Sequence, residues 1–327
     1  MKKVLLFTVT LALAAAQAKA DIASTVMLHH KGKTTLFAWD KTQDAVNAAV
    51  DGDTIYLSNG QFSPFNINKR IMVRGAGYDT IVLGGCIIAI DGTQELKMPV
   101  LDAITFNGDV KVTGAYKQCT IRKCQMTDLV FYQSEFRDVK IEQCYVTRTL
   151  HLLPNCVKEF NAFNSSIHTL RPYDYLSGHA NFYNCNILEV TDSITATFNN
   201  CVLKYVKSRK DKTNDYGTCF IACRLNYCIF GCGSVYNVTE VGGNTTSNII
   251  TIFDRSSVRS NCSFESIKDE NIAFYYNKDY LDGNGQYIGI YGDLGWTRYP
   301  ALPRVTKHSM SVDAANRKLN VTLTVSK

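Results

Sequence analysis

A sequence repeat of about 20 residues, anchored on cysteine, is the strongest constraint on the fold of this chain. The anchors follow one another at intervals of 20, 21, 20 and 16 residues, and they are Cys124, Cys144, Ser165, Cys185 and Cys201. A further copy, RSNCSFESI, surrounds Cys262, and weaker copies surround Ile104 and Cys86. Repeats this short cannot bury an apolar face alone, so they indicate a solenoid in which neighbouring copies stack.

Apolar and polar residues alternate within each copy, which is typical of strands rather than helices. The position three before the anchor holds Ile121, Ile141, Ala162, Phe182 and Phe198. The position two after it holds Met126, Val146, Ile167, Ile187 and Leu203, and the position five after it holds Leu129, Thr149, Leu170, Val190 and Val206. The alternation slips between these last two positions, so we expect a bend there. Each copy should form one coil, with parallel strands stacked about 4.8 Å apart.

The anchor cysteines are expected to point inward and to form a ladder of small buried side chains. The position before the anchor holds Lys123, Gln143, Asn164, Asn184 and Asn200. Asparagine suits a turn there because it tolerates a left-handed backbone. Since twelve cysteines in an exported chain also permit disulfides, a bond between adjacent rungs is the alternative. The cysteines do not have the spacing of a zinc site.

The first 20 residues, MKKVLLFTVTLALAAAQAKA, predict export. Lys2 and Lys3 precede an apolar run over residues 4–16, and Ala18-Lys19-Ala20 fits a signal-peptide cleavage site. We therefore expect a mature chain from Asp21 in the periplasm, at the cell surface or outside the cell. No later stretch supplies the ~20 apolar residues of a transmembrane helix. Without the signal peptide's lysines the formal charge of +6 falls to about +3, which gives no reason to expect a nucleic-acid partner.

Residues 44–82, DAVNAAVDGDTIYLSNGQFSPFNINKRIMVRGAGYDTIV, resemble the N-terminal opening of right-handed parallel β-helix proteins of the pectate-lyase-like superfamily. In that family an amphipathic helix caps the open end of the solenoid and a Gly-Asp-Thr-Ile strand begins the first coil. The resemblance implies that Asp51-Gly52-Asp53 ends the helix, that a strand covers residues 54–57, and that Asn59-Gly60 turns it. It implies that the buried side of the helix comprises Ala45, Val46, Ala48, Ala49 and Val50.

Residues 282–305, DGNGQYIGIYGDLGWTRYPALPRV, are similar to a tail of secreted β-helix proteins of Bacteroidetes-type bacteria, which implies export. Downstream of it, apolar residues alternate with polar ones at Leu319, Val321, Leu323 and Val325, which predicts an antiparallel hairpin. The expected fold class is all-β, a single-stranded right-handed parallel β-helix with an N-terminal capping helix and a C-terminal β-hairpin. We expect the signal peptide over residues 1–20, the capped β-helix over 21–276, and the C-terminal cap and hairpin over 277–327.

Two stretches carry side chains suited to saccharides, because sugar rings stack on aromatic faces and sugar hydroxyls hydrogen-bond to Arg and Asp. The candidate glycan-binding residues are Arg171, Tyr173, Asp174, Tyr175 and His179 in RPYDYLSGHANFY, and Lys207 and Arg209 in KYVKSRKDKTND. Arg171 and Lys207 each lie six residues after an anchor, so both should face one side of the solenoid, two rungs apart. There they could hold an acidic polysaccharide such as a uronan. A solvated turn and a solvated basic loop are the alternative interpretations.

The motifs of known enzymes of this superfamily are mostly missing. Its polygalacturonases carry Asn-Thr-Asp, Asp-Asp, Gly-His-Gly and Arg-Ile-Lys, of which only Gly178-His179 is an echo here. Its lyases need a base, and calcium or basic groups to neutralise a uronate carboxylate. Calcium needs clustered oxygen ligands, and the acidic residues Asp128, Asp138, Glu142 and Glu189 are scattered. We predict no catalytic residue and no cofactor or metal, except calcium in the case of a lyase; His29, His30 and His151 are interpreted as structural or exposed.

The sequence therefore predicts an exported β-helix protein that binds a polysaccharide or cell-surface glycan, or mediates adhesion, without catalysis. A polysaccharide lyase or glycoside hydrolase acting on an acidic polysaccharide is the alternative, and a purely structural module is a second alternative. The fold class does not decide among them, because one fold supports many functions. A base, an arginine and a carboxylate gathered on one exposed face would favour the enzyme.

Overall fold

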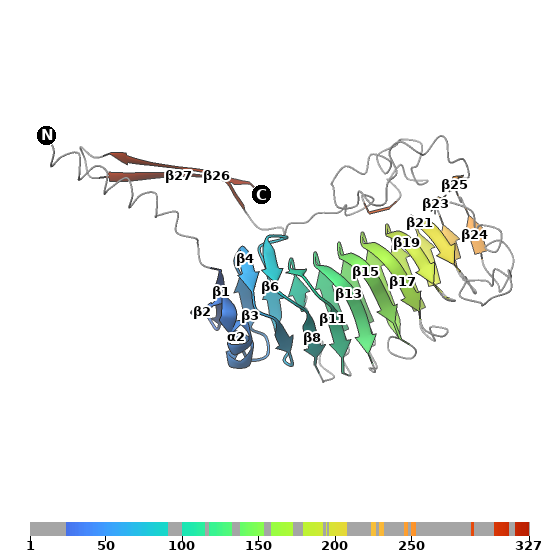
Figure 1. The fold of residues 1–327 in the computed structure, drawn as a ribbon, viewed down its shortest axis with the longest axis horizontal. Coiled ribbons are helices and arrows are strands. Elements are labelled where there is room, and N and C mark those ends of the chain that lie inside the picture. The colour runs from blue at the N-terminus through green and yellow to red at the C-terminus, as the bar shows by residue number, and fades with distance from the viewer. Residues whose placement is uncertain are drawn as a thin grey trace.

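The computed structural model contains a parallel β-solenoid whose coils stack along one axis (Figure 1). The structure describes residues 24–90, 100–114, 118–132, 138–153, 158–172, 179–191, 194, 196–207, 224–226, 229–231, 245–247, 250–252, 289–290, 304–313 and 318–326. Within these ranges, no helix is long and apolar enough to cross a membrane. The predicted all-β class and the parallel β-helix are confirmed.

Two long sheets form the walls of the solenoid, and we call them sheet A and sheet B. Sheet A has the order β2 (Lys33–Ala38), β1 (Thr25–His30), β3 (Thr54–Leu57), β6 (Met72–Arg74), β9 (Leu101–Asp102), β12 (Gln118–Arg122), β14 (Asp138–Glu142), β16 (Glu159–Phe163), β18 (His179–Tyr183), β20 (Ala196–Asn199), β22 (Arg224–Asn226) and β24 (Thr245–Ser247). Sheet B has the order β25 (Ile250–Ile252), β23 (Ile229–Gly231), β21 (Val202–Lys207), β19 (Asn186–Thr191), β17 (Ser166–Pro172), β15 (Tyr145–Leu152), β13 (Gln125–Tyr132), β10 (Thr105–Phe106), β7 (Thr80–Val82) and β4 (Gly60–Phe62). Its remaining strands, β11 (Val110–Thr113), β8 (Cys86–Ala89) and β5 (Phe65–Ile67), continue the sheet from β13.

An antiparallel hairpin of β1 and β2 closes the N-terminal end of sheet A, and β1 also pairs antiparallel with β3. The sequence analysis did not predict this hairpin. Its turn is Lys31-Gly32, where both residues have positive φ, 44° and 79°. That conformation matches the right-handed twist of the flanking strands in a two-residue hairpin.

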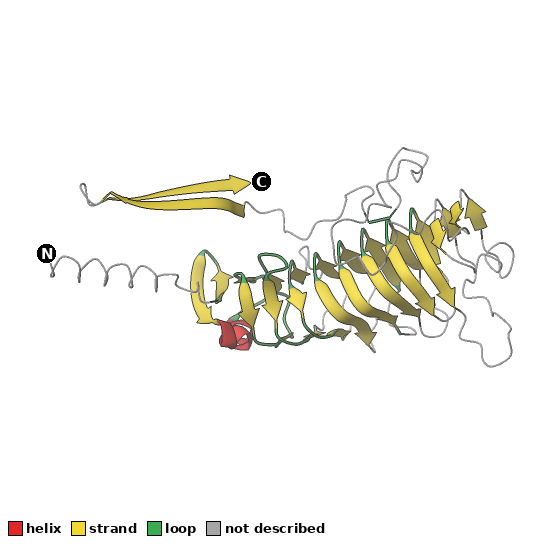
Figure 2. Cartoon of the chain, turned by 45° about the horizontal axis from the view of Figure 1, so that its top comes forward, coloured by secondary structure: helices red, strands yellow, loops and turns green. Residues whose placement is uncertain are grey.

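The predicted cap helix is present at this end, as the single-turn helix η1 (Trp39–Lys41) followed by α2 (Thr42–Ala48) (Figure 2). Ala45, Val46 and Ala49 are buried as predicted. The prediction was wrong for Ala48 and Val50, which are exposed. The helix ends at Ala48, so the residues that follow no longer keep the helical period that would turn Val50 inward.

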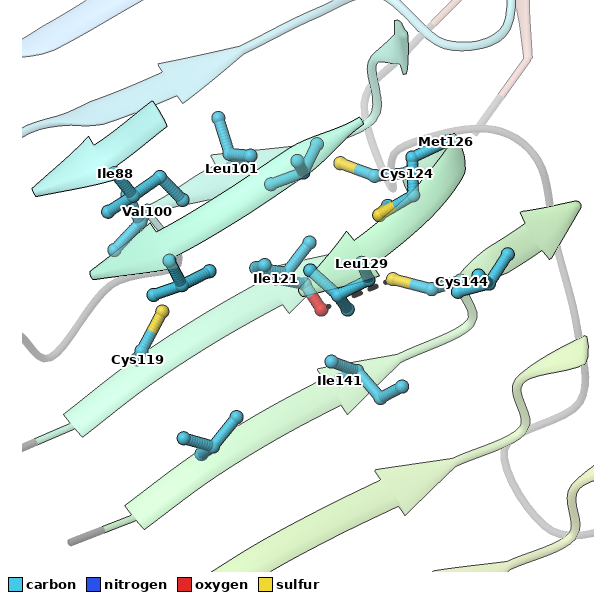
Figure 3. Close-up of a cluster of buried hydrophobic side chains, with 14 of the residues drawn as sticks. Ile88, Val100, Leu101, Cys119, Ile121, Cys124, Met126, Leu129, Ile141 and Cys144 are labelled. Carbon is cyan, nitrogen blue, oxygen red and sulfur yellow. Dashed lines mark hydrogen bonds between the residues drawn. The ribbon is translucent and has the colours of Figure 1, made fainter. Parts of the chain in front are cut away.

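The repeat positions form straight ladders across the rungs. Ile121, Ile141, Ala162, Phe182 and Phe198 pair in register along sheet A and are buried. The anchors Cys124, Cys144, Ser165, Cys185 and Cys201 are buried in the same way. Figure 3 shows Cys124 and Cys144 pointing into the core beside Ile121, Met126 and Leu129.

Each anchor side chain donates a hydrogen bond to the carbonyl two residues earlier. The thiol of Cys124 bonds the carbonyl of Arg122 at 3.2 Å, and the thiol of Cys201 bonds that of Asn199 at 3.2 Å. Ser165 makes the same contact through its hydroxyl, at 2.8 Å to the carbonyl of Phe163. The position therefore requires a small side chain with one donor, which explains why serine can replace cysteine there.

The residue before each anchor has a left-handed backbone, as the recurrent asparagine predicted. The φ values are 53° at Lys123, 53° at Gln143, 44° at Asn164, 52° at Asn184 and 54° at Asn200. This conformation is costly for most residues and mild for asparagine. It lets the chain leave sheet A and enter sheet B within two residues.

One ladder assignment was wrong. Leu150, and not Thr149, stands in line with Leu129 and Leu170. The coil of Cys144 contains an extra residue, because Thr147 and Arg148 together lie opposite one residue on each neighbouring strand. This β-bulge accounts for the one interval of 21 residues among the anchors.

The C-terminal hairpin is also present, formed by β26 (Arg304–Asp313) and β27 (Lys318–Ser326). The late repeat around Cys262, the signal peptide and the boundary between residues 276 and 277 lie outside the described residues. Gly289 and Ile290 lie against the solenoid, where the amide of Gly289 bonds the carbonyl of Asn200 at 2.7 Å.

The buried cysteines should behave as protected thiols. The described ones are free, and they are Cys86, Cys119, Cys124, Cys144, Cys185 and Cys201. Burial raises the pKa of Cys119 to about 12 and, together with smaller effects, that of Cys144 to about 12, so little reactive thiolate forms in the folded protein. We expect a thiol reagent to modify none of these six cysteines in the folded protein. It should modify all six once the chain is unfolded in denaturant without a reducing agent. An unfolded chain with no titratable thiol would contradict the free ladder and favour disulfides between rungs.

Candidate functional site

The bulge in β15 places a guanidinium on the outer face of sheet B. Since two residues of β15 occupy the space of one, Arg148 leaves the regular alternation and is 62% exposed. Bulges of this kind re-aim side chains and are common beside functional sites. Arg148 is the first member of a group of charged side chains on this face, which we call the sheet B cluster: Asp109, Asp128, Arg148, His151 and Arg171.

Arg148 holds the carboxylate of Asp128 with two hydrogen bonds. Its Nε donates to Oδ1 at 2.8 Å and its terminal nitrogen donates to Oδ2 at 2.5 Å. The amide of Thr149 adds a third bond to Oδ1 at 3.0 Å. Burial alone would raise the pKa of Asp128, but these donors outweigh it and lower the pKa below its usual value. Oδ1 of Asp109 lies 3.6 Å from the same terminal nitrogen of Arg148, so one guanidinium bridges two carboxylates.

His151 lies beside this pair, with Nε2 3.8 Å from Oδ2 of Asp128 and its side chain 17% exposed. Burial lowers the pKa of His151, Asp128 partly opposes that, and the positive charges of Arg171 and Arg148 lower it further. The imidazole is therefore neutral at neutral pH and can accept a proton. A base, an arginine and a carboxylate do gather on one face here, although the sequence interpretation treated His151 as a lone histidine.

An outer row of residues crosses the strands of sheet B next to the buried leucine ladder. Val130 pairs with His151, and His151 pairs with Arg171. Leu170 pairs with Val190, which sets Arg171 level with Thr191, and Thr191 pairs with Lys207. Arg171 and Lys207 are thus two rungs apart on the same side, as the residue count predicted.

The other predicted site residues do not all belong to this row. His179 begins β18 on sheet A, so it is in a different sheet from Arg171 and Lys207. For His179 and Lys207 the structure describes the backbone alone. Tyr173, Asp174, Tyr175 and Arg209 lie outside the described residues.

The outer face of sheet A offers aromatic rings, but their faces are already in contact. Phe163 and Tyr183 stack with centroids 5.0 Å apart and planes 9° from parallel. The ammonium of Lys140, from the preceding rung, lies 5.0 Å from the centroid of Phe163. Stacking on a sugar requires an open ring face, and Phe163 lies between Lys140 and Tyr183, so this group links successive coils of sheet A.

The charges nearer the N-terminal end of sheet A are also used within the fold. Asp102 is fully buried and accepts hydrogen bonds from Arg74 at 2.8 Å and from Arg122 at 3.0 and 2.8 Å. The same carboxylate raises the pKa of Arg122. These residues come from three successive rungs, so the group ties the coils together. Sheet B therefore carries the better candidate site.

Among the described residues, no three His, Cys, Asp or Glu side chains gather as a metal site requires. No protein-family model, no curated protein and no solved structure matches the chain.

His151 should make stability depend on pH. Its pKa is lowered in the folded state, so the unfolded chain binds the proton more readily below about pH 6.5. The contribution of neutral His151 to the free energy of unfolding should be fully present above that pH. It should fall as the pH drops toward the lowered pKa. We expect His151→Gln to weaken this fall between about pH 7 and pH 5.5, measured by urea unfolding at each pH. His168→Gln, which removes an exposed histidine of the neighbouring strand, is the control and should leave the wild-type slope. Equal slopes in wild type and His151→Gln would contradict the assignment.

Proposed function

We propose that this chain is an exported β-helix protein that binds an acidic polysaccharide along the outer face of sheet B, without catalysis. The observation that carries the proposal is the outer row, in which His151, Arg171 and Lys207 share one side of the solenoid. The signal-like N-terminus supports export to the periplasm, the cell surface or the medium.

Electrostatics favour an anionic ligand at this row. The guanidinium of Arg171, from β17, lies close enough to His151 to act on it, in addition to that of Arg148. Arg148 is paired with Asp128 and Asp109, and the strand order places Arg171 one rung and Lys207 three rungs farther along sheet B than Arg148. A sugar carboxylate could therefore accept charge-assisted hydrogen bonds from Arg171 and Lys207.

Geometry favours a polymer over a small ligand. Two rungs of a β-sheet span about 10 Å, and the outer row continues along the solenoid at this regular spacing. An extended sugar chain laid along the axis would present its acidic groups to successive rungs. The flat wall of a solenoid suits such a repetitive ligand.

The superfamily assignment belongs to the same proposal. The parallel solenoid, together with the resemblance of residues 44–82, supports membership of the pectate-lyase-like superfamily. The resemblance of residues 282–305 supports a secreted protein of the Bacteroidetes type.

Removing the two cations should weaken binding of a uronan. Each charge-assisted hydrogen bond contributes about 1.5–3 kcal/mol, so Arg171→Gln with Lys207→Gln should lower affinity at least tenfold. Titration calorimetry at low salt measures it, because screening weakens exposed charges.

The matched control is Lys31→Gln with Lys158→Gln, which removes equal charge from exposed sites off sheet B. Equal losses in both double variants would mean that net charge, and not this row, holds the polymer. Unchanged affinity in the first double variant would reject the site.

A polysaccharide lyase is a second candidate function, favoured by the neutral His151 beside arginines. In such a reaction His151 would take the proton from the carbon next to the uronate carboxylate, and a double bond would form in the ring as the bond from the ring to the glycosidic oxygen breaks. The departing oxygen would take a proton from water or from the imidazolium of His151. A hydrolase is less favoured, because the carboxylate of Asp128 is engaged by Arg148 and Thr149.

Chain cleavage distinguishes the two candidates. We expect no release of reducing ends from neutral or acidic polysaccharides, with or without calcium. Release of unsaturated products that His151→Gln abolishes, while His168→Gln retains it, would make the protein a lyase.

A further inference from the structure

Sheet A ends in a strand with an open edge. β2 is the last strand in the order of the sheet, and no described strand pairs with its outer side. Its residues are exposed except Phe37, which is half-buried against the core, and Leu36 is 65% exposed. Natural edges are commonly blocked by proline, a bulge or an inward charge. β2, with the sequence KTTLFA, contains no proline and pairs with β1 without a register shift, and its one charged residue is Lys33, next to the turn.

The hairpin geometry fixes which backbone groups of β2 point outward. In a two-residue hairpin, the residues flanking the turn exchange both hydrogen bonds, and the pairs then alternate. His30 and Lys33 flank the turn, so Lys33, Thr35 and Phe37 direct their N–H and C=O groups to β1. Thr34, Leu36 and Ala38 direct theirs to the open edge.

We infer that this edge pairs antiparallel with β2 of a second copy, about a two-fold axis through Leu36. A two-fold axis requires self-complementary pairing. With Leu36 opposite the partner's Leu36, Thr34 lies opposite the partner's Ala38, and all the outward groups of both strands are hydrogen-bonded. A shift of the axis by one residue leaves some of them unpaired. Sheet A then continues from one copy into the other.

The side chains fit this register. Residues directly opposite each other share a face, so the exposed Leu36 side chains meet on the outer face, and Thr35 meets the partner's Phe37 on the inner face. Lys33 comes near the partner's Trp39 and Asp40 instead of the partner's Lys33. The cation thus approaches an aromatic ring and a carboxylate, and like charges do not oppose each other.

The neighbouring helix does not extend past the edge strand. In Figures 1 and 2, α2 lies below β1 and β2 and does not extend past them along the solenoid axis. The interface between the two β2 strands is small, so we expect weak association. The fraction of dimer should rise with protein concentration. Exposed Leu36 and the 45% exposed Trp39 supply its apolar area.

Cysteine cross-linking tests the register. Hydrogen-bonded antiparallel pairs have Cα atoms about 5.5 Å apart, within the range of about 4.4–6.8 Å that a disulfide needs. We expect oxidised Leu36→Cys to form a covalent dimer on a non-reducing gel, above the background of wild type. Thr34→Cys should not cross-link to itself, because the partner's Thr34 is offset by about 14 Å along the strand. A mixture of Thr34→Cys with Ala38→Cys should cross-link.

Sedimentation equilibrium of the mature chain over a concentration series tests association without oxidation. Leu36→Asp places a carboxylate of each copy opposite that of the other and should shift the dimer to monomer. The control is Leu83→Asp, at an exposed site in sheet B's part of the coil, which should leave the dimer unchanged. A wild type that stays monomeric throughout, a dimer that survives Leu36→Asp, or equal cross-linking of Thr34→Cys and Leu36→Cys would each overturn the inference. None of these results depends on glycan binding.

Discussion

The in-register stacking of one turn, repeated in each coil, is the constraint on which the rest of the structure depends. At this turn a left-handed residue such as Asn184 precedes a small buried anchor such as Cys185. The anchor bonds the carbonyl two residues earlier and so fixes the bend from sheet A to sheet B. Because the bend is the same in each rung, apolar residues fall into straight ladders, and each fully buried side chain contributes about 1.5–3 kcal/mol.

The candidate site arises where this regularity fails by one residue. In the regular coils, outward side chains simply repeat from rung to rung. The extra residue in β15 lets Arg148 reach Asp128 on the preceding strand, β13. This places the guanidinium close to His151. The interior tolerates the bulge because Leu150 still takes the buried position between Leu129 and Leu170. The fold thus keeps its core and gains a charged group on one wall.

The sequence revealed what the repeat controls and missed what it does not. Counting from the anchors was enough to align Arg171 with Lys207, since both coils keep the standard length after the anchor. The same counting failed for Thr149, because the position of an extra residue within its coil is not known until the register is known. The cluster of Asp128, Arg148 and His151 forms because of that insertion. Its only signal in the sequence was the one interval of 21 residues between anchors. The β1–β2 hairpin precedes the first copy of the 20-residue repeat, so the repeat gave no information about it.

The two ends of a solenoid pose a problem that its middle does not. Inside the stack each strand has neighbours on both sides, so backbone groups and apolar faces are satisfied by repetition. At the N-terminal end, α2 covers apolar residues of the first coils, but a helix covers side chains and cannot pair a strand edge. The hairpin moves that edge outward from β3 to β2 without removing it. Since the outward groups of β2 are symmetric about Leu36, the same geometry that leaves the edge open also makes it complementary to itself.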